Sequence, residues 1–141
     1  MELGIDFGTT RTVVACADRG NHPVVGFTDP AGDAAQWIPS VVAERGGDLL
    51  FGFDAVAAAN DPSCTVTRSF KRLLGGADAG PGQEITVGSR TVGAGELTTG
   101  FLAYVRRALL ERSDLRRSSP VRPRCTRPSP SPPTPTARSA W

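Results

Sequence analysis

Apolar and polar residues alternate from the first position of the chain. Every second residue of the opening stretch is apolar: Met1, Leu3, Ile5 and Phe7. A period of two predicts a strand with one apolar face, and it places Asp6 on the opposite face. The β-branched run at 12–17 predicts a return strand after a turn over Gly8–Arg11. The chain is therefore expected to begin with a β-hairpin.

The next fifty residues predict further short strands. Residues 24–27 are apolar enough for a third strand, whereas the polar, Gly- and Pro-containing stretch 28–36 is typical of a loop. The run 38–43 predicts another strand, with Pro39 at its entrance, where a missing N–H is tolerated. We expect residues 49–51 to pair with it across a Gly-containing turn.

Two helices, a hairpin and a third, longer helix follow in the pattern. The alanine-dense stretch 54–59 predicts a helix, and 66–74 predicts a second short helix that ends at a Gly-Gly pair. Residues 84–92 predict a hairpin, with Gly first in its two-residue loop. The clearest amphipathic helix is expected over 96–112, where apolar residues recur at helical spacing.

The last 26 residues have a different composition from the rest. Residues 1–115 carry 10 basic and 14 acidic side chains, a net charge of −4, whereas residues 116–141 carry six Arg and no acid. This final segment also holds seven Pro and has no periodicity, so it cannot offset the entropy of ordering. We expect one partial domain over 1–115 and a disordered tail over 116–141.

Composition narrows the class of protein. The chain has 141 residues, 39% of them hydrophobic, with no apolar run near the roughly 20 residues that span a bilayer. Its start lacks the basic and apolar regions of a secretory signal. The three cysteines are odd in number and form no C-x-x-C, which argues against a disulfide framework or a zinc site. We expect a cytoplasmic protein that binds neither membranes nor nucleic acid.

The opening turn carries the residues with the clearest chemistry. Gly8 permits close backbone approach, Thr9 and Thr10 add hydroxyl donors, and consecutive N–H groups form an anion-binding nest. Asp6 beside them is suited to holding Mg²⁺ through water. The stretch matches neither the P-loop nor the dinucleotide fingerprint. The alternative is an ordinary hairpin with a glycine turn.

Four further residues have side chains of functional interest: Lys71, His22, Trp37 and Phe51. Lys71 is the only lysine in the chain; its ammonium group suits a γ-phosphate, but a solvated lysine on a helix is the ordinary alternative. His22 lies in a Gly-Asn-His-Pro turn and is expected to be a surface residue. Trp37 and Phe51 are expected in the core rather than as a stacking platform.

Several segments together resemble the start of the 70-kDa heat-shock protein chaperones, the DnaK-type family. The matching segments are Gly4-Ile5-Asp6-Phe7-Gly8-Thr9-Thr10, Ile38-Pro39-Ser40-Val41-Val42-Ala43, Gly52 with the alanine helix and Asp61-Pro62, and Lys71-Arg72-Leu73-Leu74-Gly75. The resemblance covers about residues 2–115. The Gly-Thr-Thr motif alone is shared with sugar kinases and actin-like proteins.

The resemblance implies a fold, a ligand and partners. The fold is an α/β, actin-like (ribonuclease H-like) ATPase lobe with a mixed sheet. The ligands are ATP and Mg²⁺, with the metal held by Asp6 through water, the phosphates by Gly8–Arg11, and Lys71 taking part in hydrolysis. Arg11 departs from the family pattern: an arginine there either adds a phosphate contact or narrows the pocket. The implied partners are unfolded client peptides, J-domain co-chaperones and nucleotide exchange factors.

The family's downstream segments do not follow in this chain. After residue 112 the family continues into a strand, where this chain has Pro, Arg, Ser and Thr. One hypothesis is an out-of-frame translation beginning near codon 115. We expect ATP binding with weak or no hydrolysis, and apolar faces left open by the missing remainder. The alternatives are a small-molecule kinase fragment of the same superfamily and an inactive binding module.

Overall fold

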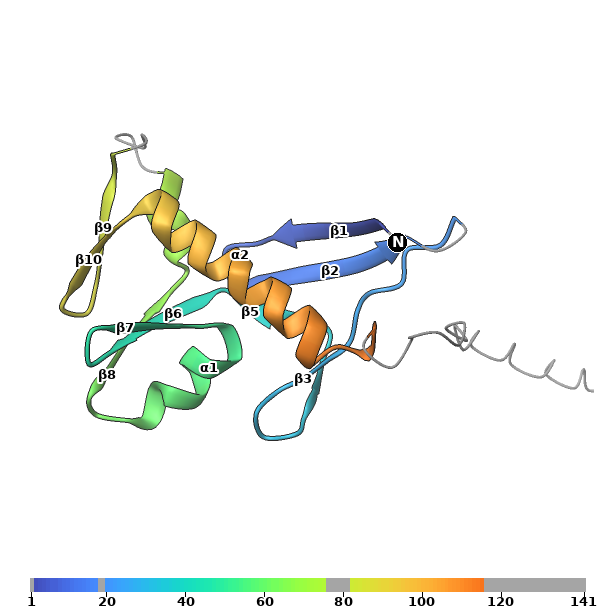
Figure 1. Ribbon diagram of the computed structural model, residues 1–141, viewed down its shortest axis with the longest axis horizontal. Coiled ribbons are helices and arrows are strands. Elements are labelled where there is room, and N and C mark those ends of the chain that lie inside the picture. Colours follow the sequence, from blue (N-terminus) through green and yellow to red (C-terminus); the bar gives the residue numbers. More distant parts are fainter. Residues whose placement is uncertain (1, 18–19, 76–81, 116–141) are drawn as a thin grey trace, which may run out of the picture.

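The computed structural model describes residues 2–17, 20–75 and 82–115 of the chain (Figure 1). Its strands are β1 (Glu2–Phe7), β2 (Arg11–Ala17), β3 (Phe27–Thr28), β4 (Ala34–Ala35), β5 (Ile38–Pro39), β6 (Val41–Arg45), β7 (Asp48–Phe51), β8 (Cys64–Arg68), β9 (Glu84–Val87) and β10 (Arg90–Gly93). Its helices are α1 (Gly52–Ala57), the 3₁₀ turns η1 (Ala58–Asn60) and η2 (Phe70–Gly75), and α2 (Ala94–Glu111). The described chain is thus a mixed α/β protein.

Strand pairing within the described residues is antiparallel throughout. Two three-stranded sheets have the orders β1-β2-β5 and β7-β6-β8, and β9-β10 and β3-β4 form separate two-stranded hairpins. The mixed sheet that we expected is not found among them. Most neighbouring strands are joined by short turns, which produce antiparallel pairs, and parallel pairs need longer crossovers.

The first sheet places β2 between β1 and β5. Asp6 lies opposite Val13 in the β1–β2 ladder, and Arg11 lies opposite Pro39 in the β2–β5 ladder. β2 sends Val14 into the core, but β1 is an edge strand whose Ile5 is 48% exposed. The predicted opening hairpin is confirmed, although the apolar face of β1 is covered only near its end.

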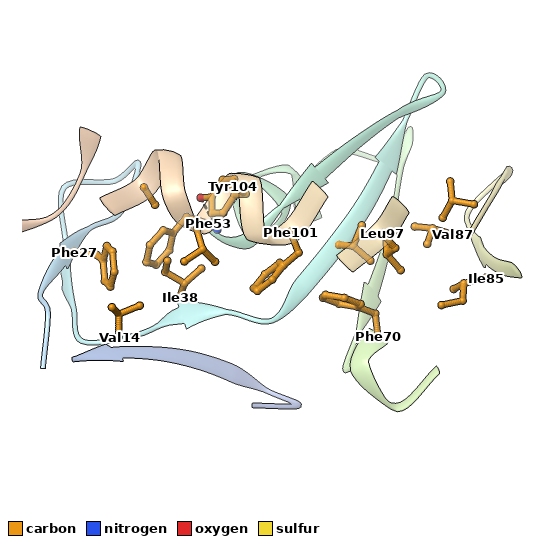
Figure 2. Close-up of a cluster of buried hydrophobic side chains, with 14 of the residues drawn as sticks. Val14, Phe27, Ile38, Phe53, Phe70, Ile85, Val87, Leu97, Phe101 and Tyr104 are labelled. Carbon is orange, nitrogen blue, oxygen red and sulfur yellow. Dashed lines mark hydrogen bonds between the residues drawn. The ribbon is translucent and has the colours of Figure 1, made fainter. Parts of the chain in front are cut away.

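Helix α2 covers the strands with one face (Figure 1). The buried residues of this helix recur at helical spacing: Leu97, Phe101, Tyr104, Val105 and Ala108. Figure 2 shows this face pointing toward Phe70, Ile38 and Phe53 in one continuous hydrophobic cluster. The predicted amphipathic helix is confirmed, with its start two residues earlier than expected.

The shorter helix α1 packs against β5, β6 and β7 and is tied to α2. The Phe53 N–H donates a hydrogen bond to the Tyr104 hydroxyl at 3.0 Å. The predicted helix over 54–59 is confirmed in part, because its last residues belong to the 3₁₀ turn η1.

The helix predicted over 66–74 is wrong. Residues Cys64–Arg68 form strand β8, which pairs with β6. Three consecutive β-branched residues, 65–67, favour the strand. The strand ends at Arg68, and the 3₁₀ turn η2 begins after Ser69, whose φ of 54° lies in the left-handed region.

Smaller differences concern the middle of the chain. Of the strand predicted at 24–27, only Phe27 lies in β3, and Val24 forms an isolated bridge to Ala15. The loop predicted at 28–36 contains β4, and the run at 38–43 divides at Ser40 into β5 and β6. The pairing of 49–51 and the hairpin at 84–92 are confirmed.

The disorder and the frameshift proposed for 116–141 lie outside the described residues. None of the described helices has both the length and the apolar character needed to cross a bilayer.

Candidate functional site

The turn between β1 and β2 is closed by its own backbone. The Gly8 N–H donates a hydrogen bond to the Asp6 carbonyl at 3.1 Å. A Cβ atom at Gly8 would overlap the backbone carbonyl of Arg11. Only glycine therefore fits the turn as it stands, and its contribution is the close approach of the two chain segments.

The next two backbone N–H groups of the turn belong to Thr9 and Thr10. Among residues 2–17, 20–75 and 82–115, no acceptor receives the N–H of Thr9 or Thr10. The carbonyl of Thr10, by contrast, accepts the Ser40 N–H at 3.0 Å, so this peptide is anchored from the β5–β6 junction. Unpaired consecutive amides at a fixed turn are the donors that bind phosphate oxygens.

A buried hydroxyl pair lies beneath the turn. Thr12 Oγ1 and Ser40 Oγ are 3.0 Å apart, and both residues are fully buried. Each hydroxyl supplies the hydrogen-bonding partner that the other needs away from water. Sequence reasoning singled out neither hydroxyl. The Pro39-Ser40 segment was noted, but nothing in the sequence pairs it with Thr12.

Lys71 is brought to this turn from 64 residues along the chain. Its ammonium group donates a hydrogen bond to the backbone carbonyl of Phe7, which is the last residue of β1. The same ammonium group lies 5.0 Å from the centroid of the Phe7 ring. The structure therefore places Lys71 at Phe7, the residue before Gly8. It lies on a 3₁₀ turn rather than on the expected helix.

Aromatic packing holds Lys71 in this place. Phe70, the residue before it, is fully buried, with its ring centroid 5.9 Å from that of Phe7 and 5.3 Å from that of Phe101. The Phe7 and Phe101 rings stack with their centroids 5.1 Å apart. Figure 2 shows Phe70 and Phe101 side by side in this cluster. The left-handed Ser69 turns the chain from β8 into this cluster.

Asp6 faces solvent beside the turn. Its carboxylate is exposed and forms no ion pair within the described part of the chain. That part also contains no group of three or more His, Cys, Asp or Glu side chains able to enclose a metal. One carboxylate is sufficient for Mg²⁺ that keeps several waters and shares the phosphate oxygens of its ligand.

Other residues considered for function lie elsewhere or have ordinary surroundings. His22 is exposed in its turn, as expected. Trp37 is 39% exposed, so the prediction that it belongs to the core is wrong, whereas Phe51 is half-buried and packs against the cluster. Trp37 lies in a bend directly before β5.

No protein-family model matches the chain. The residues that meet at the β1–β2 turn are therefore the evidence that bears on function.

Proposed function

We propose that this chain binds Mg²⁺-ATP at the β1–β2 turn, as the N-terminal part of an actin-like ATPase lobe of the heat-shock-70 type. One observation carries the proposal. The only lysine of the chain reaches the end of β1, one residue from the glycine of the turn. A solvated lysine on a helix surface has no reason to lie there.

Each residue has a role that its position supports. The Thr9 and Thr10 amides donate to phosphate oxygens, and Gly8 allows the chain to turn closely around them. The exposed Asp6 carboxylate orients waters of the bound Mg²⁺, which neutralises phosphate charge. The Lys71 ammonium, which donates a hydrogen bond to the Phe7 carbonyl, is proposed to contact the phosphate chain or the attacking water.

Hydrolysis by this chain alone is proposed to be weak or absent. Phosphoryl transfer depends on several positioned charges around the reacting phosphate. The described residues contribute Asp6 and Lys71, without a further acidic cluster beside them. At the family level the proposed function is ATP-dependent protein folding in the cytoplasm, with client peptides, J-domain co-chaperones and exchange factors as partners.

Calorimetric titration of the full chain with ATP, with and without Mg²⁺, tests the proposal. We expect saturable binding that Mg²⁺ strengthens, and a loss of at least about tenfold in Mg²⁺-ATP affinity on Asp6→Asn. Lys71→Gln is expected to weaken binding by a similar factor. Asp48→Asn is the matched control, because Asp48 is an exposed acid on the β6–β7 hairpin.

Three outcomes would contradict parts of the proposal. Absence of binding to the folded wild-type chain, checked by circular dichroism, would leave an inactive binding module. If Asp6→Asn and Asp48→Asn weakened binding equally, the ligand would not be bound at the β1–β2 turn. Steady-state ATP hydrolysis at the rates of complete ATPases would refute the proposed loss of activity.

A further inference from the structure

The backbone of Arg11 is held in place on one side of the turn. Arg11 is the first residue of β2 and pairs with Pro39 of β5. The Thr10 carbonyl just before it is fixed by the Ser40 N–H. The backbone of Arg11 therefore has a defined position, directly after the unpaired amides of Thr9 and Thr10.

The register places the Arg11 side chain on the same face as Asp6. Asp6 lies opposite Val13, and directly paired side chains of an antiparallel ladder share a face. Residues two apart on a strand also share a face, so Arg11 joins them. The intervening Thr12 points the other way, into the core, where it is fully buried.

The guanidinium of Arg11 has no anionic partner on this face. Arg11 is exposed and takes part in no ion pair within residues 2–17, 20–75 and 82–115, although the Asp6 carboxylate lies on the same face. Lys71 lies at the other end of the turn, at Phe7. Arg11 and Lys71 thus lie at the two ends of the turn that carries Thr9 and Thr10.

We infer that Arg11 binds the phosphate chain of the ligand directly, an inference that rests on the proposed function. A guanidinium presents paired N–H donors that match two phosphate oxygens, so one arginine fixes both the position and the orientation of the phosphate. An exposed side chain with no partner is free to turn toward the ligand. This favours a phosphate contact over the alternative that Arg11 narrows the pocket.

The test compares Mg²⁺-ATP with Mg²⁺-tripolyphosphate, which has the phosphates but no nucleoside, by calorimetry on the full chain. Arg11→Gln is expected to weaken both ligands at least about tenfold. Arg11→Lys keeps the charge but loses the paired donors, so its affinity is expected to fall between wild type and Arg11→Gln. Arg106→Gln removes the same charge from an exposed position on α2 and is expected to leave both affinities unchanged.

The outcomes separate this inference from the function on which it rests. Wild-type affinity in Arg11→Gln, with ATP still bound, would overturn the role of Arg11 and leave the proposed function intact. Weaker binding of ATP alone, with tripolyphosphate unaffected, would assign Arg11 to the nucleoside and also overturn the inference. If neither ligand binds the wild-type chain, the proposed function fails and the inference with it.

Discussion

At the scale of single residues, the two glycines of the opening strand and turn occupy different surroundings. Gly8 lies where an added Cβ would overlap the Arg11 carbonyl, whereas an added Cβ at Gly4 would meet nothing within 4 Å. Gly4 is a position within β1 and Gly8 follows the end of that strand. The turn therefore requires a glycine at position 8, whereas the strand has room for a larger residue at position 4.

Gly8→Ala is expected to lower Mg²⁺-ATP affinity by at least about tenfold, because the turn has to open to admit the methyl group. Calorimetric titration measures the loss, and Gly4→Ala is the control, expected to bind as the wild type does. Equal affinities of the two variants would show that the conformation of the turn does not matter for the ligand.

The buried hydroxyls of Thr12 and Ser40 give a prediction about stability. Thr12→Val leaves the Ser40 hydroxyl buried without its side-chain partner, which is expected to cost about 1–3 kcal/mol of unfolding free energy. Adding Ser40→Ala removes the unpaired group, so the double variant should lose less than the sum of the two single losses.

Urea unfolding measures these differences. Thr86→Val is the control: the Thr86 and Thr91 hydroxyls are 3.4 Å apart and exposed, so its loss is expected to be within about 0.5 kcal/mol. Strict additivity of the Thr12 and Ser40 substitutions would show that the two hydroxyls do not depend on one another.

Residue by residue, the sequence reveals local chemistry better than distant contacts. Asp6, Gly8, Thr9 and Thr10 lie within five positions, so a strand and a turn are enough to bring them together. The place of Lys71 followed only from the resemblance, because 64 residues separate it from its acceptor. The pairing of Thr12 with Ser40 depends on the β2–β5 register, which no local pattern specifies.

At the scale of elements, Glu44 connects two hairpins. Its carboxylate accepts the Gly47 N–H at 2.6 Å within the β6–β7 hairpin and the Ser89 N–H at 3.3 Å from the β9–β10 turn. These backbone hydrogen bonds, that from Gly47 most of all, lower the pKa of Glu44, while burial acts in the opposite direction. The ionised form is therefore the one that the folded protein favours.

The lowered pKa predicts a stability that acid removes. In the unfolded chain Glu44 titrates at its ordinary, higher pKa, so its contribution is complete above that value and is lost as pH falls through the lowered folded pKa. The unfolding free energy is expected to fall less steeply between about pH 5 and about pH 3 in Glu44→Gln than in the wild type. Asp48→Asn, which removes an exposed acid from the same hairpin, should keep the wild-type slope. Identical slopes in all three proteins would contradict the role of Glu44.

The elements differ in how well the pattern of the sequence predicted them. α2 is long, and its five buried positions repeat at helical spacing, so the prediction was right. The segment 64–75 is short, and it changes from a strand to a 3₁₀ turn at Ser69. Its apolar residues 66, 70, 73 and 74 have helical spacing, but the pairing with β6 and the packing of Phe70 determine its conformation.

At the scale of the whole molecule, β1 is the edge strand of its sheet and carries exposed apolar side chains. Leu3 is 41% and Ile5 48% exposed, and in the described part of the chain β1 pairs only with β2. An open strand edge with exposed apolar residues favours pairing with further chains. Exposed apolar faces of this kind were expected from the sequence, and β1 has one.

We therefore expect the protein to self-associate with rising concentration, and Ile5→Lys to reduce this. A charge on the edge strand opposes strand pairing, whereas Leu110→Lys places the same charge at a 59% exposed position on helix α2. Light scattering over a concentration series should show a lower apparent mass for Ile5→Lys alone. Because Ile5 lies on the face opposite Asp6, the variant should keep its Mg²⁺-ATP affinity. An equal reduction by both lysine variants would point to net charge, rather than the β1 edge, as the cause of association.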